Sequence, residues 1–213
     1  MQLRRSPLCT GCAARARCAG LFDPVREDVF ARDDAELHAL IAGLAGDVLD
    51  VGCGHGPYGD TLAARVASGD VRYVGVDPDE ARVAALRARW PWAELHATAA
   101  EELDPARRFD HALVLRSWNH LRNPLRALEN FAMCLRPGGT LLVVDNEAFA
   151  LVRSRRHASA AEGGASIFEH FRNDGADQAE AMIAAALPGA TRLLRRDVGP
   201  ETSNQWVLWY RVG

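Results

Sequence analysis

The sequence predicts an α/β protein built on a doubly wound, seven-stranded, mostly parallel sheet with helices on both faces. Three observations predict this. Short apolar runs alternate with longer segments of helical periodicity, a glycine-rich loop follows the first run, and an acidic residue ends the second. The 213 residues, 48% hydrophobic and 25% charged, suit one main globular domain. Collagen, coiled coil and low-complexity disorder are excluded by this composition.

Local periodicity predicts each element in turn. Apolar runs bounded by turn residues predict strands, and apolar residues three and four positions apart predict helices. The predicted strands are 48–51, 71–76, 93–97, 109–115, 140–145, 191–197 and 205–212. The predicted helices are an amphipathic one from Val25 to a stop near 43–46, then 58–66, 79–90, 125–135 and 176–187. The triplet Pro137-Gly138-Gly139 predicts a helix stop followed by a turn.

Two segments fall outside this alternation. Residues 1–22 contain three of the five cysteines and few large apolar groups, which predicts a Cys-rich extension without a core of its own. Residues 23–213 then form the main domain. Within it, residues 146–175 are too long for a plain connection and are predicted to be a substrate lid.

Composition excludes several classes of function. A formal net charge of -3 provides no long-range attraction for phosphate backbones, so nucleic acid is an unlikely partner. All 25 basic residues are Arg, which excludes a Schiff-base lysine and a P-loop lysine. There is no apolar run of about 18 residues and no secretory signal, so the sequence predicts a cytoplasmic protein without a membrane partner.

The glycine loop is the strongest local sign of a binding site. Gly52, Gly54 and Gly56 lie where the first strand ends and a helix begins, so the backbone can approach a ligand that a Cβ would block. Asp77 ends the second strand, where its carboxylate can accept hydrogen bonds from ribose hydroxyls. The alternative is a tight turn with a helix cap at Asp77 before Pro78.

The spacing argues against a dinucleotide. A G-x-G-x-x-G fingerprint that starts at Gly52 meets Pro57 where it needs glycine, and the frame on Gly54 starts two residues late. Asp50, just before the first glycine, would repel a pyrophosphate but could accept a hydrogen bond from an ammonium group. The sequence therefore predicts a nucleoside ligand that carries a cation.

Five segments in order resemble the class I S-adenosylmethionine-dependent methyltransferases, over about residues 46–212. They are VLDVGCGHG, YVGVD, AAEEL, FDHALVL and LRPGGTLLVVD. The resemblance implies a Rossmann-like fold, S-adenosyl-L-methionine as cofactor, and methyl transfer as the activity. It implies that the three glycines admit the methionine part of the cofactor, that Asp77 holds the ribose, and that Glu101 lies near the adenine. Ala99 stands where many relatives carry Asp. The predicted cofactor-binding residues are Asp50, Gly52, Gly54, Gly56, Asp77, Pro78, Glu101 and Arg116.

The acceptor is predicted to bind against the loops that follow the fourth and fifth strands. His120 is the best candidate for a general base, because an imidazole titrates near neutral pH. The alternative is a histidine that only bonds a backbone carbonyl. Glu169 and His170, in the predicted lid, are further catalytic candidates, with an amphipathic surface turn as the alternative.

The acceptor itself is predicted to be a small molecule, and a hydroxyl is favoured. Asp145, Glu147 and Glu169 are predicted to lie near the site and would also tolerate a cationic acceptor. Two rivals stay open. One is a non-catalytic cofactor-binding protein or partner subunit, and the other is a nicotinamide oxidoreductase, which Asp50 and Pro57 oppose.

Cys9, Cys12 and Cys18 have the spacing C-x2-C-x5-C, which suits the start of a zinc or iron–sulfur site. The stretch resembles the auxiliary-cluster tail of radical S-adenosylmethionine enzymes, although Phe22 stands where that family has a fourth Cys. Candidates for a fourth ligand are Cys53, His38 and His55. The alternatives are a relic without metal, or a tail that docks a protein partner.

Overall fold

A computed structural model describes residues 16, 31–147, 171–199, 202 and 205–213 of the chain. Cys9, Cys12 and Cys18 lie outside the described residues, as do Glu169 and His170. The described part of the predicted lid is its two ends, 146–147 and 171–175.

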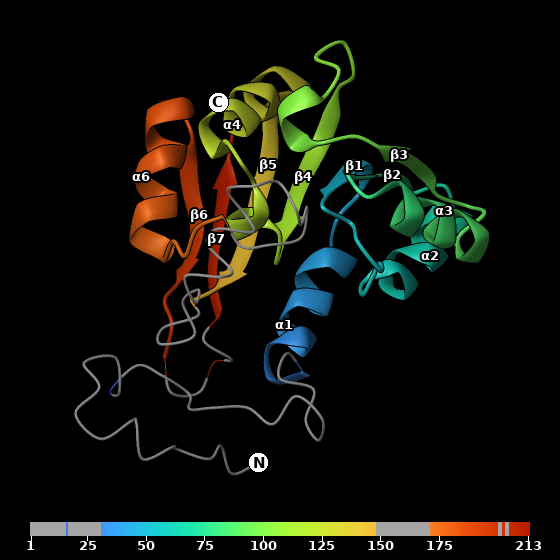
Figure 1. The fold of residues 1–213 in the computed structure, drawn as a ribbon, viewed down its shortest axis with the longest axis horizontal. Coiled ribbons are helices and arrows are strands. Elements are labelled where there is room, and N and C mark those ends of the chain that lie inside the picture. The colour runs from blue at the N-terminus through green and yellow to red at the C-terminus, as the bar shows by residue number, and fades with distance from the viewer. Residues whose placement is uncertain (1–15, 17–30, 148–170, 200–201, 203–204) are drawn as a thin grey trace.

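The centre of the fold is a seven-stranded sheet in the order β3-β2-β1-β4-β5-β7-β6 (Figure 1). Neighbouring strands are parallel from β3 to β5, and β7 is antiparallel to both β5 and β6. The strands are β1 (Gly46–Val51), β2 (Val71–Asp77), β3 (Glu94–Ala97), β4 (Phe109–Leu115), β5 (Leu135–Asn146), β6 (Thr191–Arg196) and β7 (Gln205–Arg211). The predicted fold class is confirmed.

Helices cover both faces of this sheet (Figure 1). They are α1 (Ala31–Ala42), α2 (Gly59–Ala67), α3 (Glu80–Arg89), α4 (Pro124–Cys134) and α6 (Ala176–Ala186). The first three pack on one face and the last two on the other, so β5 buries alternate residues in two separate cores. Leu141 and Val143 face α4 and α6, whereas Leu142 and Val144 face the core of α1, α2 and α3. No helix in the described part of the chain is long and apolar enough to cross a membrane.

The structure differs from the prediction at Pro137-Gly138-Gly139. These residues interrupt the pairing register inside β5, and the strand begins at Leu135 rather than at 140. Gly138 has a φ of 80° and its N–H donates to the Val212 carbonyl over 2.9 Å. The reason is that Leu135 pairs with Phe109 of β4, while Val212, just after β7, bonds the irregular backbone at Gly138 and Gly139. Periodicity along the chain does not reveal these partners.

Parallel pairing brings the carboxyl ends of β1, β2, β3, β4 and β5 to one edge of the sheet. The short 3-10 helices η2 (Ala100–Glu102) and η3 (Trp118–His120) begin at this same edge. The candidate site lies there.

Candidate active site

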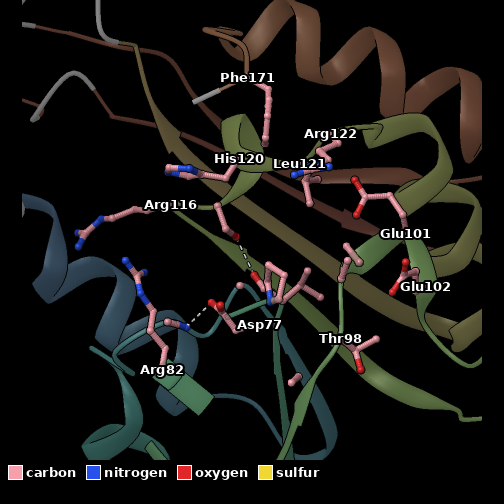
Figure 2. Close-up of a pocket in the computed structure, with 18 residues that line it drawn as sticks. Asp77, Arg82, Thr98, Glu101, Glu102, Arg116, His120, Leu121, Arg122 and Phe171 are labelled. Carbon is pink, nitrogen blue, oxygen red and sulfur yellow. Dashed lines mark hydrogen bonds between the residues drawn. The ribbon is translucent and has the colours of Figure 1, made fainter. Parts of the chain in front are cut away.

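A cavity of about 720 Å³ opens beyond the carboxyl ends of the parallel strands. The cavity is lined by residues of the glycine loop, of β2, of the loop and 3-10 helix after β3, and of the loop after β4 (Figure 2). Gly52, Gly54, Asp77, Pro78 and Glu101 are among them, as are Arg116 and His120. The structure therefore brings seven of the predicted site residues to one cavity.

At the first position of the loop only glycine fits, because Ser117, just after β4, occupies the space of a side chain. Gly52 has a φ of 73°, and a Cβ built on it would lie 2.5 Å from the Cβ of Ser117. Ser117 in turn donates its hydroxyl to the Val51 carbonyl over 2.6 Å. The absent side chain thus lets the end of β1 lie directly against the residues that follow β4.

Asp77 anchors the second glycine. Its Oδ2 accepts the Gly54 N–H over 2.9 Å, and its Oδ1 accepts the Asp79 N–H over 2.9 Å. Asp77 is buried yet lines the cavity (Figure 2). Each carboxylate oxygen can accept a second hydrogen bond, so the carboxylate retains capacity for a pair of ribose hydroxyls.

Asp50 and Gly56 do not line this cavity. The Asp50 carboxylate is buried and accepts the Tyr73 hydroxyl over 2.7 Å. Burial raises the pKa of Asp50 to about 6, an effect reinforced by the nearby charge of Asp77. Contact between Asp50 and an ammonium group stays a prediction, and Gly56 faces Trp90 rather than the cavity.

The acidic end of the cavity comes from η2. Glu101 accepts the Asn123 N–H over 2.9 Å, and Asn130 donates its amide to the Ala100 carbonyl over 2.9 Å. These bonds tie the 3-10 helix to the start and the middle of α4. Ala99 lines the cavity, where its methyl group offers no hydrogen bond to an adenine amino group.

Arg116 takes an unusual backbone conformation for a side-chain-bearing residue, with a φ of 58°. Its N–H donates to the Val144 carbonyl over 2.7 Å. Its guanidinium bonds Asp34 of α1 at 2.5 Å and Gln205 of β7 at 3.2 Å, and lies 5.6 Å from the centre of the Tyr58 ring. Arg116 therefore joins α1, the start of α2 and β7 at the rim of the cavity.

The remaining wall follows β4. His120, Leu121, Arg122 and Phe171 line it, with the Arg122 guanidinium 5.3 Å from the centre of the Phe171 ring. Figure 2 shows His120 between Arg116 and Phe171 on this side. Sequence reasoning did not identify Arg122, because a single Arg in a loop carries no signal without its neighbours in space.

Two acidic groups expected beside the acceptor lie elsewhere. Asp145 is almost fully buried, and its carboxylate accepts the N–H groups of Asn119 and Asn146, each over 2.7 Å. Burial raises the pKa of Asp145 to about 6. Glu147 lies against Gly175, where a Cβ would meet its Oε1. Neither residue lines the cavity, so neither carboxylate is placed to contact a cationic acceptor bound there.

A comparison with models of protein families finds a match for this chain. The model of the methyltransferase domain family matches residues 25–181, which is more than half of the chain. The match begins after the Cys-rich segment, and nothing found supports the resemblance of that segment to radical S-adenosylmethionine enzymes. Within the part of the chain that is described, there is no group of three His, Cys, Asp or Glu residues able to hold a metal.

Individual proteins similar to this chain are methyltransferases as well. A probable S-adenosylmethionine-dependent methyltransferase of Mycolicibacterium smegmatis is 38% identical over 116 residues, covering 54% of this chain and 44% of the relative. A ubiquinone biosynthesis O-methyltransferase of Bradyrhizobium diazoefficiens is 32% identical over 100 residues, covering 45% and 38%. The chain thus spans less than half the length of these relatives.

Solved structures share the fold. The N-methyltransferase NodS from Bradyrhizobium japonicum in complex with S-adenosyl-L-homocysteine superposes with a TM-score of 0.60 at 18% identity, covering 92% of this chain and 95% of NodS. The [4+2]-cyclase SpnF superposes with a TM-score of 0.61 at 23% identity, covering 86% and 82%.

Proposed function

Because the chain belongs to the class I S-adenosylmethionine-dependent methyltransferase family, we propose that it transfers a methyl group from S-adenosylmethionine to a small-molecule acceptor, with a hydroxyl as the favoured nucleophile. The observation that carries the proposal is the pairing of Asp77 with Gly54 at the cavity. It places a carboxylate able to bind a ribose diol beside backbone that a ligand can approach closely.

The cavity residues fit this cofactor. Gly52 and Gly54 line the cavity, and the missing side chain of Gly54 leaves its backbone open to the methionine part. Asp77 and Pro78 would hold the ribose, and Glu101 would lie near the adenine. The cofactor supplies a methyl group on a cationic sulfur, which a nucleophile displaces in line. The protein's share in such a displacement is chiefly orientation and exclusion of water.

His120 is the residue we assign to the acceptor proton. It lines the cavity on η3, where the Ser117 carbonyl accepts the backbone N–H of His120 over 3.1 Å. The imidazole side chain can take a proton from an attacking hydroxyl near neutral pH. Glu169 and His170 remain candidates for the same task.

Charge on the acceptor side favours an acidic or neutral acceptor over a cation. Among the described lining residues, the carboxylates are Asp77, Glu101 and Glu102, and these come from β2 and η2. The wall after β4 contributes His120 and Arg122 instead, together with Arg116, whose guanidinium is already paired with Asp34. A phenolic or carboxylate-bearing hydroxyl compound suits that wall, because Arg pairs readily with anionic oxygen.

The rival in another class is a protein that uses the same cavity without methyl transfer. SpnF shares the fold and is a [4+2]-cyclase, so the fold alone does not fix the reaction. Calorimetric titration of the full chain with S-adenosyl-L-homocysteine tests the cofactor site. Transfer of labelled methyl from S-adenosylmethionine to 4-hydroxybenzoate, 4-hydroxybenzamide and tyramine then tests reaction and acceptor charge together.

The outcomes of that test separate the alternatives. Methyl transfer to the first two phenols in preference to tyramine supports the proposal. Binding of S-adenosyl-L-homocysteine without transfer to a broad panel of hydroxyl, amine and carbon acceptors favours the binding-protein rival. Failure to bind S-adenosyl-L-homocysteine overturns the proposed function itself.

For the Cys-rich segment we propose either a zinc or iron–sulfur site at Cys9, Cys12 and Cys18 or a docking segment for a protein partner. The support is the spacing of the three thiols alone. Metal analysis of the purified full chain and of a variant with all three changed to Ser distinguishes the two. Equal metal content in both preparations would show that the three thiols bind no metal.

A further inference from the structure

The outer side of the glycine loop contacts two residues at the end of α3 that no motif points to. Arg89 is the last residue of that helix and Trp90 is its C-terminal cap. The Trp90 side chain is 4% exposed, so its indole lies inside the protein against the loop.

Two glycines make room for that indole. A Cβ built on Gly56 would lie 2.0 Å from Cη2 of Trp90, and a Cβ on Gly59 would lie 1.7 Å from Cζ2. Both distances are far below any van der Waals contact, and neither glycine lines the large cavity. The space that these glycines leave is therefore occupied by the protein's own side chain.

Arg89 holds the same part of the loop through hydrogen bonds. Its Nη2 donates to the His55 carbonyl over 2.6 Å and to the Gly56 carbonyl over 3.2 Å. Its guanidinium carbon lies 4.9 Å from the centre of the Trp90 ring. Arg89 thus bonds two consecutive carbonyls of the loop, and Trp90 packs against Gly56 and Gly59.

The indole is itself held by other rings. Trp92 stacks on it with a centroid distance of 5.1 Å, and Tyr73 meets it edge-on at 6.1 Å. The Tyr73 hydroxyl donates to Asp50, the residue two positions before the first glycine. The cluster therefore supports both ends of the loop.

The inner side of the loop is fixed by β2. The N–H groups of Gly52 and Cys53 donate to the Val76 carbonyl over 2.7 and 3.0 Å, and Gly54 donates to Asp77. The loop thus has β2 on one side and the Arg89–Trp90 pair on the other. Both sets of contacts hold its conformation.

We infer that Arg89 and Trp90 are positioning residues for the cofactor loop, and that Gly56 and Gly59 are glycines in order to admit the indole. The inference rests on the proposed function, since the loop must be the one that holds S-adenosylmethionine. It replaces the role that the motif assigns to Gly56, which is to admit the ligand.

The test measures the dissociation constant for S-adenosyl-L-homocysteine by calorimetry and the thermal midpoint of the ligand-free full chain. Arg89→Gln is compared with Arg87→Gln, because Arg87 on the same helix also donates to a backbone carbonyl, that of Leu95. Loss of the loop contacts is expected to weaken binding about 3- to 10-fold in Arg89→Gln. The Arg87→Gln control is expected to stay within about twofold of wild type, whatever its thermal midpoint.

A second comparison uses the ring. Trp90→Phe is expected to weaken binding, whereas Trp92→Ala, which removes a ring stacked on the same indole, is expected to have the smaller effect. Gly59→Ala is expected to weaken binding about tenfold or more in the wild-type background, because its methyl group meets the indole. The same change is expected to cost little in a Trp90→Ala background, where the methyl group has room.

Each outcome decides the inference. Lower thermal midpoints with unchanged dissociation constants in Arg89→Gln and Trp90→Phe would show a purely structural role and overturn it. Equal effects of Gly59→Ala in both backgrounds would also overturn it. Failure of the wild-type chain to bind S-adenosyl-L-homocysteine would instead overturn the proposed function, and it is visible in the first titration.

Discussion

The side chain of Asn119 bonds both backbone polar groups of Asp174. Its Oδ1 accepts the Asp174 N–H over 2.8 Å, and its Nδ2 donates to the Asp174 carbonyl over 3.4 Å. The indole N–H of Trp118 donates to the Asp174 carboxylate over 3.0 Å, and that of Trp206 to its carbonyl over 3.1 Å. The chain that leads into α6 is thereby fixed to the 3-10 helix that carries His120.

Asn119→Ala is the first test of this arrangement. Asn119 is fully buried, so the change leaves polar groups of Asp174 short of partners, and the free energy of unfolding is expected to fall by about 1–3 kcal/mol. Methyl transfer is expected to fall as well, because the 3-10 helix that carries His120 loses its side-chain bonds to Asp174. Urea unfolding and turnover check the two effects. Stability equal to wild type would contradict the prediction.

Asp77→Asn tests the ribose contact. The change removes the charge and replaces one acceptor oxygen by a donor, so affinity for S-adenosyl-L-homocysteine is expected to fall by about 1–3 kcal/mol, or roughly 5- to 150-fold. Asp79→Ala is the matched control, because Asp79 caps α3 two residues later without lining the cavity. It is expected to lower stability and leave calorimetric affinity near wild type. Equal losses in both variants would remove Asp77 from the site.

His120→Ala is expected to lower turnover about 100-fold if its imidazole takes the acceptor proton. Affinity for S-adenosyl-L-homocysteine is expected to stay near wild type, since the proton is taken from the acceptor. His96→Ala provides the control, because His96 is a partly exposed histidine that pairs with Glu94 away from the cavity. Near-normal turnover in His120→Ala would contradict a general-base role and would mean that orientation of the acceptor and the cofactor accounts for the rate.

The pH dependence of stability tests the buried carboxyl groups. Burial raises the pKa of Asp50 and of Asp145 from 3.8 to about 6. The folded chain therefore holds more protons than the unfolded chain between about pH 4 and 6, so these groups lower the free energy of unfolding as pH rises through that window. Asp50→Asn is expected to reduce this fall by up to about 3 kcal/mol.

Urea unfolding of wild type and Asp50→Asn from pH 4 to pH 7 is the measurement. Glu94 and Glu180 have their pKa lowered to about 2 by hydrogen bonds from Arg107 and Tyr210 respectively, so they act in the opposite direction at lower pH. The difference between variant and wild type removes their contribution. A difference that does not change with pH would contradict the assignment to Asp50.

Sequence patterns predicted the sheet and several residues that line the cavity, because strand alternation and turn residues at strand ends are local signals. Alternation of apolar runs with helical periodicity identified all seven strands, and turn residues at strand ends identified Gly52, Gly54 and Asp77. The predicted strand boundaries differ from the observed ones where residues far away in the sequence fix the end of a strand. The early start of β5 depends on the pairing of Leu135 with Phe109 of β4, 26 residues earlier, and on hydrogen bonds that join Gly138 and Gly139 to Val212.

The surroundings of Gly56 and Asp145 were not predicted, because they depend on contacts between residues far apart in the sequence. Gly56 belongs to the same glycine motif as Gly52 and Gly54, but it packs against the Trp90 ring, 34 residues away along the chain. Asp145 was predicted beside the acceptor because it ends a strand at the correct edge of the sheet. Its side chain turns inward to backbone N–H groups, and no spacing rule predicts that orientation.

The contact between Arg116 and Asp34 holds α1 against the rim of the cavity. Free-energy coupling is reciprocal, so a ligand that orders Arg116 must also favour the docked position of α1, and to the same extent. The Asp34–Arg116 ion pair is the contact through which such a ligand would act on the helix.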